Sequence, residues 1–184
     1  MIARGRAASM RRPGFDLGVA TRRAWLVALL GVACAASAQP LEPARGPVLL
    51  TLTGKLARAD AAGEARFDMA MLAALPQHSF TTRTPWYPQP RKFTGVRLRD
   101  LLAAVGAGGS DVRAIALNDY RAEIPAEDIA RHDVTIAYLL DDQPMRVRDK
   151  GPLVVIYPFD SRPEIRTAVH HSRAVWQLHR IEVK

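Results

Sequence analysis

The sequence predicts an α+β domain. Two observations lead to this prediction: short β-branched and apolar runs recur from Pro47 to Val183, and three short segments of helical character interrupt them. No internal repeat is visible. Short strands interleaved with short helices are typical of mixed α+β packing around one core.

The first elements follow from turn and cap residues. The run "PVLLTLTG" (47–54) is β-branched and apolar, and predicts a strand. Asp68 is a suitable N-cap for a short helix over 69–75. The stretch "QHSFTTRT" (77–84) is expected to be extended, because Pro85 disfavours a helical conformation at the residue before it.

The middle of the chain contains the clearest helical pattern. Apolar residues at helical spacing predict a second helix, which the glycines from Gly106 onward end. The stretch "VRAIALNDYRAEIP" (112–125) predicts two strands joined by a tight turn at Asn118 and Asp119. Pro125 then opens a third short helix, with acidic residues in its first turn.

Three further strands are expected in the last third of the chain. They are "VTIAYLLDDQPM", "GPLVVIYP" and "AVWQLHRIEV". In the last of these, strict alternation would place Val175, Gln177, His179 and Ile181 on one face of the strand.

The N-terminal residues 1–38 are predicted to be an export signal. A basic start precedes an apolar run over 24–35, and Ala36-Ser37-Ala38 matches an Ala-x-Ala cleavage site. The pair Arg22-Arg23 fits a twin-arginine signal and an ordinary Sec signal equally well. We therefore expect one domain over 39–184, exported by a bacterium to the periplasm or the medium.

Charge and cysteine content exclude several classes of function. Six of the 26 Lys and Arg and one of the 18 Asp and Glu lie in residues 1–38, so the remainder has a net charge of +3 instead of +8. Its basic residues are scattered, so nucleic-acid binding is not expected. Because Cys34 is the only cysteine, residues 39–184 have no disulfide, no thiolate metal ligand and no cysteine nucleophile.

The stretch "TTRTPWYPQP" (81–90) is the first candidate site. Hydroxyls, a guanidinium and aromatic rings could line a pocket for an anion or a flat heterocycle; these are Thr82, Arg83, Thr84, Trp86 and Tyr87. The alternative is a loop braced by prolines whose aromatic side chains pack on the core.

The other candidates are weaker. His170 and His171 are expected in an extended segment, where adjacent side chains point to opposite faces, so no metal site is predicted. Tyr120 follows the Asn118-Asp119 turn and could reach a pocket. The basic turn "RVRDK" (146–150) could bind phosphate, although a solvated charged turn is the commoner explanation. No nucleophile and base stand at a diagnostic spacing, so catalytic residues stay unknown.

Three segments, in this order, resemble sulfite-oxidase-type molybdopterin-binding domains. They are "TTRTPWYPQPRKFTGVRLRDLL", "DKGPLVVIYP" and "RAVWQLHRIEV". The resemblance implies a mixed α+β fold and a molybdopterin cofactor. It places Thr82 where the family has its molybdenum-binding cysteine, Thr84 at a glutamate and Trp86 at a tryptophan. It also places Val154 at an arginine that holds the cofactor's phosphate, and Arg173 at a basic residue that contacts the cofactor.

The resemblance leaves three hypotheses. The first is a degenerate member that binds a small anionic or heterocyclic ligand and presents it to a membrane-bound receptor. The second is an active molybdopterin-dependent oxidoreductase with an atypical metal site and a redox partner. The third is an interaction domain with an empty pocket. A threonine hydroxyl replaces a thiolate poorly as a soft ligand, which favours the readings without ordinary molybdenum ligation.

Overall fold

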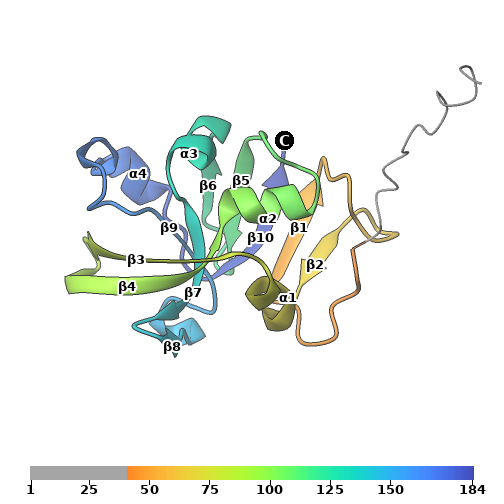
Figure 1. Cartoon of the computed structure of the whole chain (residues 1–184), viewed down its shortest axis with the longest axis horizontal. Coiled ribbons are helices and arrows are strands. Elements are labelled where there is room, and N and C mark those ends of the chain that lie inside the picture. Colours follow the sequence, from red (N-terminus) through yellow and green to blue (C-terminus); the bar gives the residue numbers. More distant parts are fainter. Residues whose placement is uncertain (1–40) are drawn as a thin grey trace, which may run out of the picture. The chain divides into compact units, whose positions relative to one another are not determined.

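Two β-sheets organise residues 41–184, the part of the chain that the computed structural model describes (Figure 1). The predicted export signal over 1–38 lies outside the described residues. The first sheet has the strand order β2 (Ala65–Phe67), β1 (Leu50–Gly54), β10 (Leu178–Val183), β5 (Val112–Ala116) and β6 (Arg121–Ile124). Strands β1 and β10 pair in parallel, whereas the other neighbours in this sheet are antiparallel.

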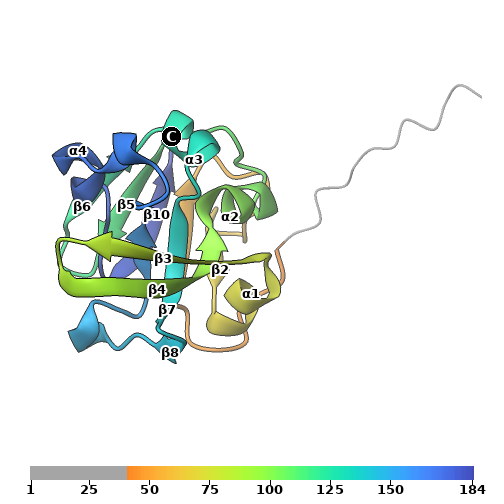
Figure 2. The same ribbon diagram turned by 60° about the vertical axis from the view of Figure 1, so that its left-hand side comes forward.

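The second sheet is built around a long hairpin. Its order is β3 (Gln77–Thr84), β4 (Tyr87–Arg97), β7 (Thr135–Leu140) and β8 (Gln143–Pro144), and β9 (Val154–Ile156) also pairs with β7. Figure 2 shows the β3–β4 hairpin running across β7. Because β7 pairs with β4 only from Phe93 to Arg97, the other end of the hairpin extends beyond the sheet. Pro88 and Pro90 lie in that end, where a strand can lack backbone donors.

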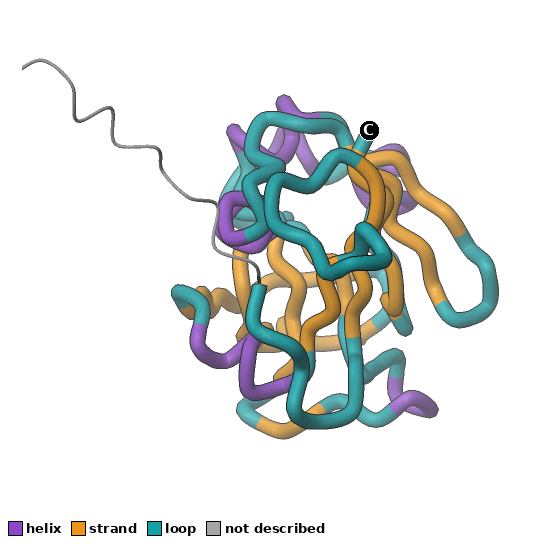
Figure 3. Tube along the Cα trace, turned by 90° about the vertical axis from the view of Figure 1, so that its right-hand side faces the viewer, coloured by secondary structure: helices purple, strands orange, loops and turns teal. Residues whose placement is uncertain are grey.

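The helices are short and lie around the strands (Figure 3). They are α1 (Met69–Ala74), α2 (Leu98–Ala104), α3 (Ala126–Arg131) and α4 (Ala168–Ser172), with single 3₁₀ turns η1 (Val147–Asp149) and η2 (Pro163–Ile165). Within residues 41–184, no helix has the length and apolar character needed to cross a membrane. Helices this short depend on tertiary contacts, because isolated helices of this length do not persist in water.

The α+β prediction is confirmed, and so are most of the expected elements. The Asp68 carboxylate accepts a hydrogen bond of 2.9 Å from the backbone N–H of Met71, as an N-cap should. Helix α2 buries Leu98, Leu101 and Leu102 completely. The β5–β6 turn has Asp119 at a φ of 63°, a left-handed conformation that Asn and Asp tolerate better than most residues.

The last third of the chain departs from the prediction. Strand β10 begins at Leu178, not at Ala174, and the expected alternation of faces is wrong. A β-bulge between Leu178 and Arg180 shifts the register, so Leu178 and Ile181 are both fully buried. The helix α4 was not predicted, and it places His170 and His171 on a helix instead of an extended segment.

Gly95, in the Phe-Thr-Gly segment of β4, lies too close to β7 for any larger residue. A Cβ atom on Gly95 would lie 2.0 Å from the carbonyl oxygen of Ile136 on β7. We predict that Gly95→Ala lowers the free energy of unfolding by about 2–3 kcal/mol, because the two strands must separate locally. Urea unfolding of the purified variant measures this change.

Gly108→Ala is the matched control for this prediction. No atom lies within 4 Å of the Cβ that Gly108 would gain, so we expect a change of less than about 0.5 kcal/mol. Equal stability of the Gly95 and Gly108 variants would contradict the steric argument.

Candidate functional site: an aromatic pocket at the hairpin tip

The tip of the β3–β4 hairpin is held against the loop that follows β9. Thr82 is fully buried, and its Oγ1 accepts a hydrogen bond of 3.0 Å from the backbone N–H of Asp160. The same hydroxyl donates to the carbonyl oxygen of Arg83 at 3.3 Å. The backbone N–H of Arg83 in turn donates to the Asp160 carboxylate at 2.8 Å. Thr82 therefore acts as a structural link between β3 and this loop.

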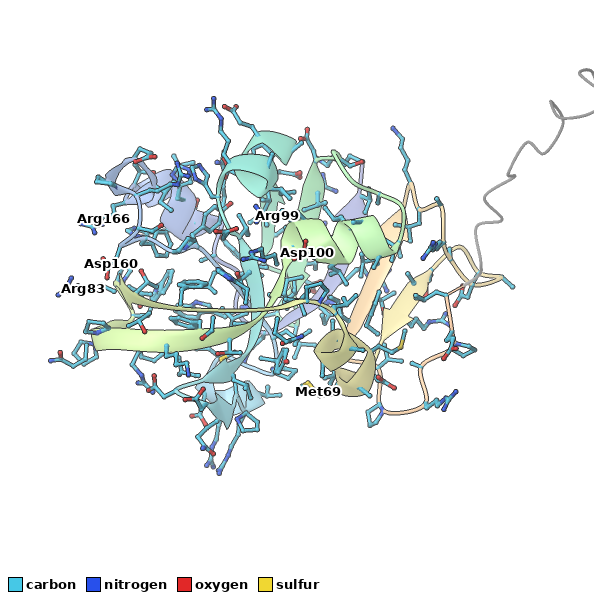
Figure 4. All side chains as sticks on the ribbon, viewed as in Figure 1. Met69, Arg83, Arg99, Asp100, Asp160 and Arg166 are labelled. Carbon is cyan, nitrogen blue, oxygen red and sulfur yellow. The ribbon has the colours of Figure 1, made fainter. Side chains whose placement is uncertain are left out.

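Two arginines flank the same carboxylate at the surface. Nη1 of Arg83 lies 3.7 Å from Asp160 Oδ2, and Nη2 of Arg166 lies 3.1 Å from Oδ1. Figure 4 shows these three side chains together at the hairpin end. A shallow cavity of about 220 Å³ lies here and is bordered also by Thr84 and Pro85. One carboxylate opposes two guanidinium groups, so Asp160 reduces the positive charge at this cavity without cancelling it.

A second candidate cavity is bordered by Trp86. It has a volume of about 290 Å³ and lies between the hairpin tip, the β5–β6 turn, α4 and the segment before β10; its lining residues are Trp86, Ala116, Asn118, Tyr120, His171, Ala174, Trp176 and Gln177. We call it the aromatic pocket. The rings of Trp86 and Trp176 meet edge to face, with centroids 5.0 Å apart and an interplanar angle of 87°. Such perpendicular pairs are favourable and orient both rings.

Helix α4 forms one wall of the aromatic pocket. The ring centroid of His171 lies 6.0 Å from that of Trp86 and 4.6 Å from that of Phe159. The Tyr120 hydroxyl donates a hydrogen bond of 2.7 Å to the carbonyl oxygen of Ser172. This bond closes the pocket between the β5–β6 turn and α4.

A lysine places positive charge beside the aromatic pocket. Nζ of Lys150 lies 4.8 Å from the ring centroid of Trp176 and 5.0 Å from that of Tyr87. Both contacts have the geometry of a cation–π interaction. Trp176 thus contacts a cation and also lines the pocket.

Arg173, which the resemblance places at a cofactor contact, forms an ion pair with Asp128 instead. Its Nη1 donates to Oδ2 of Asp128 at 2.7 Å, and the Tyr157 hydroxyl donates to the same oxygen at 2.8 Å. Burial, followed by the neighbouring Asp128 charge, raises the pKa of Tyr157 well above its usual range. The tyrosine therefore stays a hydrogen-bond donor at any physiological pH.

The structure does not bring the predicted site residues together in one place. Trp86 and Tyr120 meet in the aromatic pocket, whereas Arg83 and Thr84 border the shallow cavity. Val154, at the position expected for a phosphate-binding arginine, is buried in β9 with 3% exposure. The sequence did not single out Trp176, and it suggested His171 only as a candidate metal ligand in an extended segment, not as part of a pocket.

The basic turn at 146–150 borders a wider and more open depression. Its charged lining mixes three arginines, Arg91, Arg146 and Arg148, with Asp141 and Asp149. The Nε of Arg91 lies 2.5 Å from Asp141 and that of Arg148 lies 3.7 Å from Asp149. Such pairings between exposed side chains are typical of a solvated charged surface, which was the alternative to phosphate binding for this turn.

Comparison with protein-family models matches residues 56–160 to the family described as the oxidoreductase molybdopterin-binding domain. The matched residues are more than half of the chain and include the hairpin and β9, so the chain belongs to this family. The resemblance to its sulfite-oxidase-type members agrees with this assignment. A search of curated proteins returns no significant match. The family implies molybdopterin binding.

The role of the Thr82 hydroxyl can be measured directly. We predict that Thr82→Val lowers the free energy of unfolding by about 1–3 kcal/mol, because the partly buried N–H of Asp160 loses its acceptor. Thermal or urea unfolding reports the change. Thr81→Val, at the exposed neighbouring position, should alter stability by less than about 0.5 kcal/mol. If both variants are equally stable, Thr82 does not hold the tip.

Proposed function

We propose that this domain binds a small, flat heterocyclic ligand carrying negative charge in the aromatic pocket, without ordinary molybdenum ligation. The observation that carries the proposal is the pocket wall made by the perpendicular Trp86 and Trp176 rings together with Tyr120. Aromatic faces of this kind stack on planar ligands. The charge of Lys150, whose Nζ lies 4.8 Å from the ring centroid of Trp176, favours a ligand with an anionic substituent.

The residues present do not fit the usual attachment of the metal. Residues 41–184 contain no cysteine, because the only cysteine is Cys34. Thr82, which the resemblance aligns with the ligand cysteine, is fully buried with its hydroxyl bonded to backbone groups. These observations support a member that has kept the fold while losing thiolate ligation.

The two basic residues expected to contact the cofactor are not free to do so: one is replaced by an apolar residue, and the other forms an ion pair within the protein. Val154 is apolar and buried, and Arg173 forms an ion pair with Asp128. The pocket volume of about 290 Å³ lies at the lower end of the range for small-molecule sites. A single fused ring system fits this volume better than a pterin with its metal and phosphate.

The second candidate function is a molybdopterin-dependent oxidoreductase with an atypical metal site. The family match across the hairpin and β9 favours it. In that case the cofactor would supply the redox chemistry, while Trp86 and Tyr120 would shape the space beside it. Bound molybdenum separates this candidate from the first.

The proposed location is the periplasm or the medium, in a bacterium. The support is the basic and apolar pattern over 1–38 with its Ala-x-Ala ending. A ligand-binding domain in that compartment would pass its signal to a membrane-bound receptor, and an oxidoreductase would need a membrane-bound redox partner. No nucleic-acid partner is proposed.

Pterin-6-carboxylate is a suitable probe, because it is planar, heterocyclic and anionic. We predict that the protein binds it and that Tyr120→Ala weakens binding about tenfold, since an aromatic wall contributes about 1.4 kcal/mol. Isothermal titration calorimetry measures both affinities. Leu117→Ala is the matched control, because Leu117 lies in the same turn but outside the pocket lining.

Trp86→Phe provides an independent test of the same pocket, since it shrinks one wall but keeps a ring against Phe159. It should weaken binding of the probe as well. The proposal fails if the protein binds neither pterin-6-carboxylate nor a planar anion such as a flavin mononucleotide. It also fails if both pocket variants bind as tightly as the unmodified protein.

A further inference from the structure

We propose that Asp128, His132 and His170 form a binding site for a divalent transition metal, with zinc as the expected ion. One ligand atom from each side chain lies within 4.8 Å of the other two. Asp128 belongs to α3 and His132 is its C-cap, whereas His170 belongs to α4. This site is separate from the aromatic pocket and does not depend on what that pocket binds.

The backbone brings the three side chains together in two steps. Residues four apart on a helix lie one above the other on the same face, which places His132 next to Asp128. Helix α4 then presents His170 across the gap, with the rings of His132 and His170 5.9 Å apart and perpendicular. His171, the next residue, faces Phe159 instead, so the two adjacent histidines serve different sites.

The donor set and its spacing suit zinc. Two imidazoles and one carboxylate, with one position left open, are the ligands of many zinc sites. Nε2 of His170 lies 3.9 Å from Oδ2 of Asp128. Ligands of a tetrahedral zinc ion with bonds of about 2.0–2.1 Å are about 3.4 Å apart. The ligand atoms lie within 4.8 Å of one another, so their separations need to shorten by at most about 1.4 Å for the site to close around the ion.

A buried nitrogen without a partner is the second observation that points to a ligand. His132 has only 9% of its surface exposed, and its Nδ1 is buried without a hydrogen bond to any described residue. Buried polar atoms in folded proteins almost always have a partner, and an exception indicates a bound ion or water. A metal bound by the imidazole would explain why the protein keeps this residue's polar ring inside.

The surroundings orient the other two ligands. The Nδ1 of His170 lies 2.8 Å from Oγ1 of Thr167, which leaves Nε2 directed toward Asp128. Tyr157 and Arg173 both donate to Oδ2 of Asp128, and no hydrogen bond among the described residues uses Oδ1. Such outer contacts fix ligand orientation in metal sites.

One electrostatic effect opposes metal binding. The guanidinium of Arg173 repels a dication and also shares the carboxylate. We therefore expect micromolar affinity, weaker than that of a structural zinc site.

The test is zinc binding by the purified protein without a histidine tag, after treatment with a chelator. Calorimetry should show one zinc ion per chain, and Co²⁺ should give the visible absorption of a tetrahedral complex. His170→Ala and His132→Ala should each weaken binding at least tenfold. His78→Ala, which removes a histidine outside the cluster, should bind zinc as the unmodified protein does.

A stability measurement keeps the test decisive if one variant folds poorly. Zinc should raise the melting temperature of the unmodified protein and of His78→Ala, but not that of His170→Ala, whose site is on the short surface helix α4. Circular dichroism of the metal-free variants establishes that they are folded. The proposal is wrong if the unmodified protein binds no zinc, or if folded His170→Ala binds it equally well.

Discussion

The ion pair between Asp128 and Arg173 is the constraint on which the site depends. Helix α4 has five residues and cannot persist alone, so its position comes from tertiary contacts. The carboxylate of Asp128 holds Arg173 at the end of α4 and also accepts a bond from Tyr157 beyond β9. One buried carboxylate thereby aligns α3, β9 and α4. Because α4 carries His171 and the Ser172 carbonyl, the wall of the aromatic pocket follows from this alignment.

Local signals were enough to predict most of the fold. The cap at Asp68, the leucine spacing of α2 and the Asn118-Asp119 turn act over a few residues, and each produces the expected element. The errors lie where tertiary contacts override local pattern. Gln177 has a φ of 51° and the bulge in β10 follows it, so the expected alternation fails at the start of β10. Neither the positive φ of Gln177 nor the bulge can be predicted from the local sequence.

The site was predictable only in part, for a related reason. Composition singled out the stretch around Trp86, and its tip does border a pocket. However, β3 alternation buries Thr82 and exposes Arg83, which separates residues that are adjacent in sequence. Arg173 matched a cofactor contact of the family but forms an internal ion pair. Trp176 and His171, which contact Trp86, lie far from it along the chain. Their approach to Trp86 depends on α4, a helix that the sequence did not predict.

The domain has the family's fold, and we propose that it lacks the family's thiolate attachment of molybdenum. The most direct measurement is elemental and pterin analysis of the protein purified from the periplasm of a host that makes molybdopterin. We expect molybdenum far below one atom per chain, with no fluorescent pterin released on oxidation. Near-stoichiometric molybdenum together with a released pterin would contradict the claim and establish that the domain holds the cofactor without a cysteine.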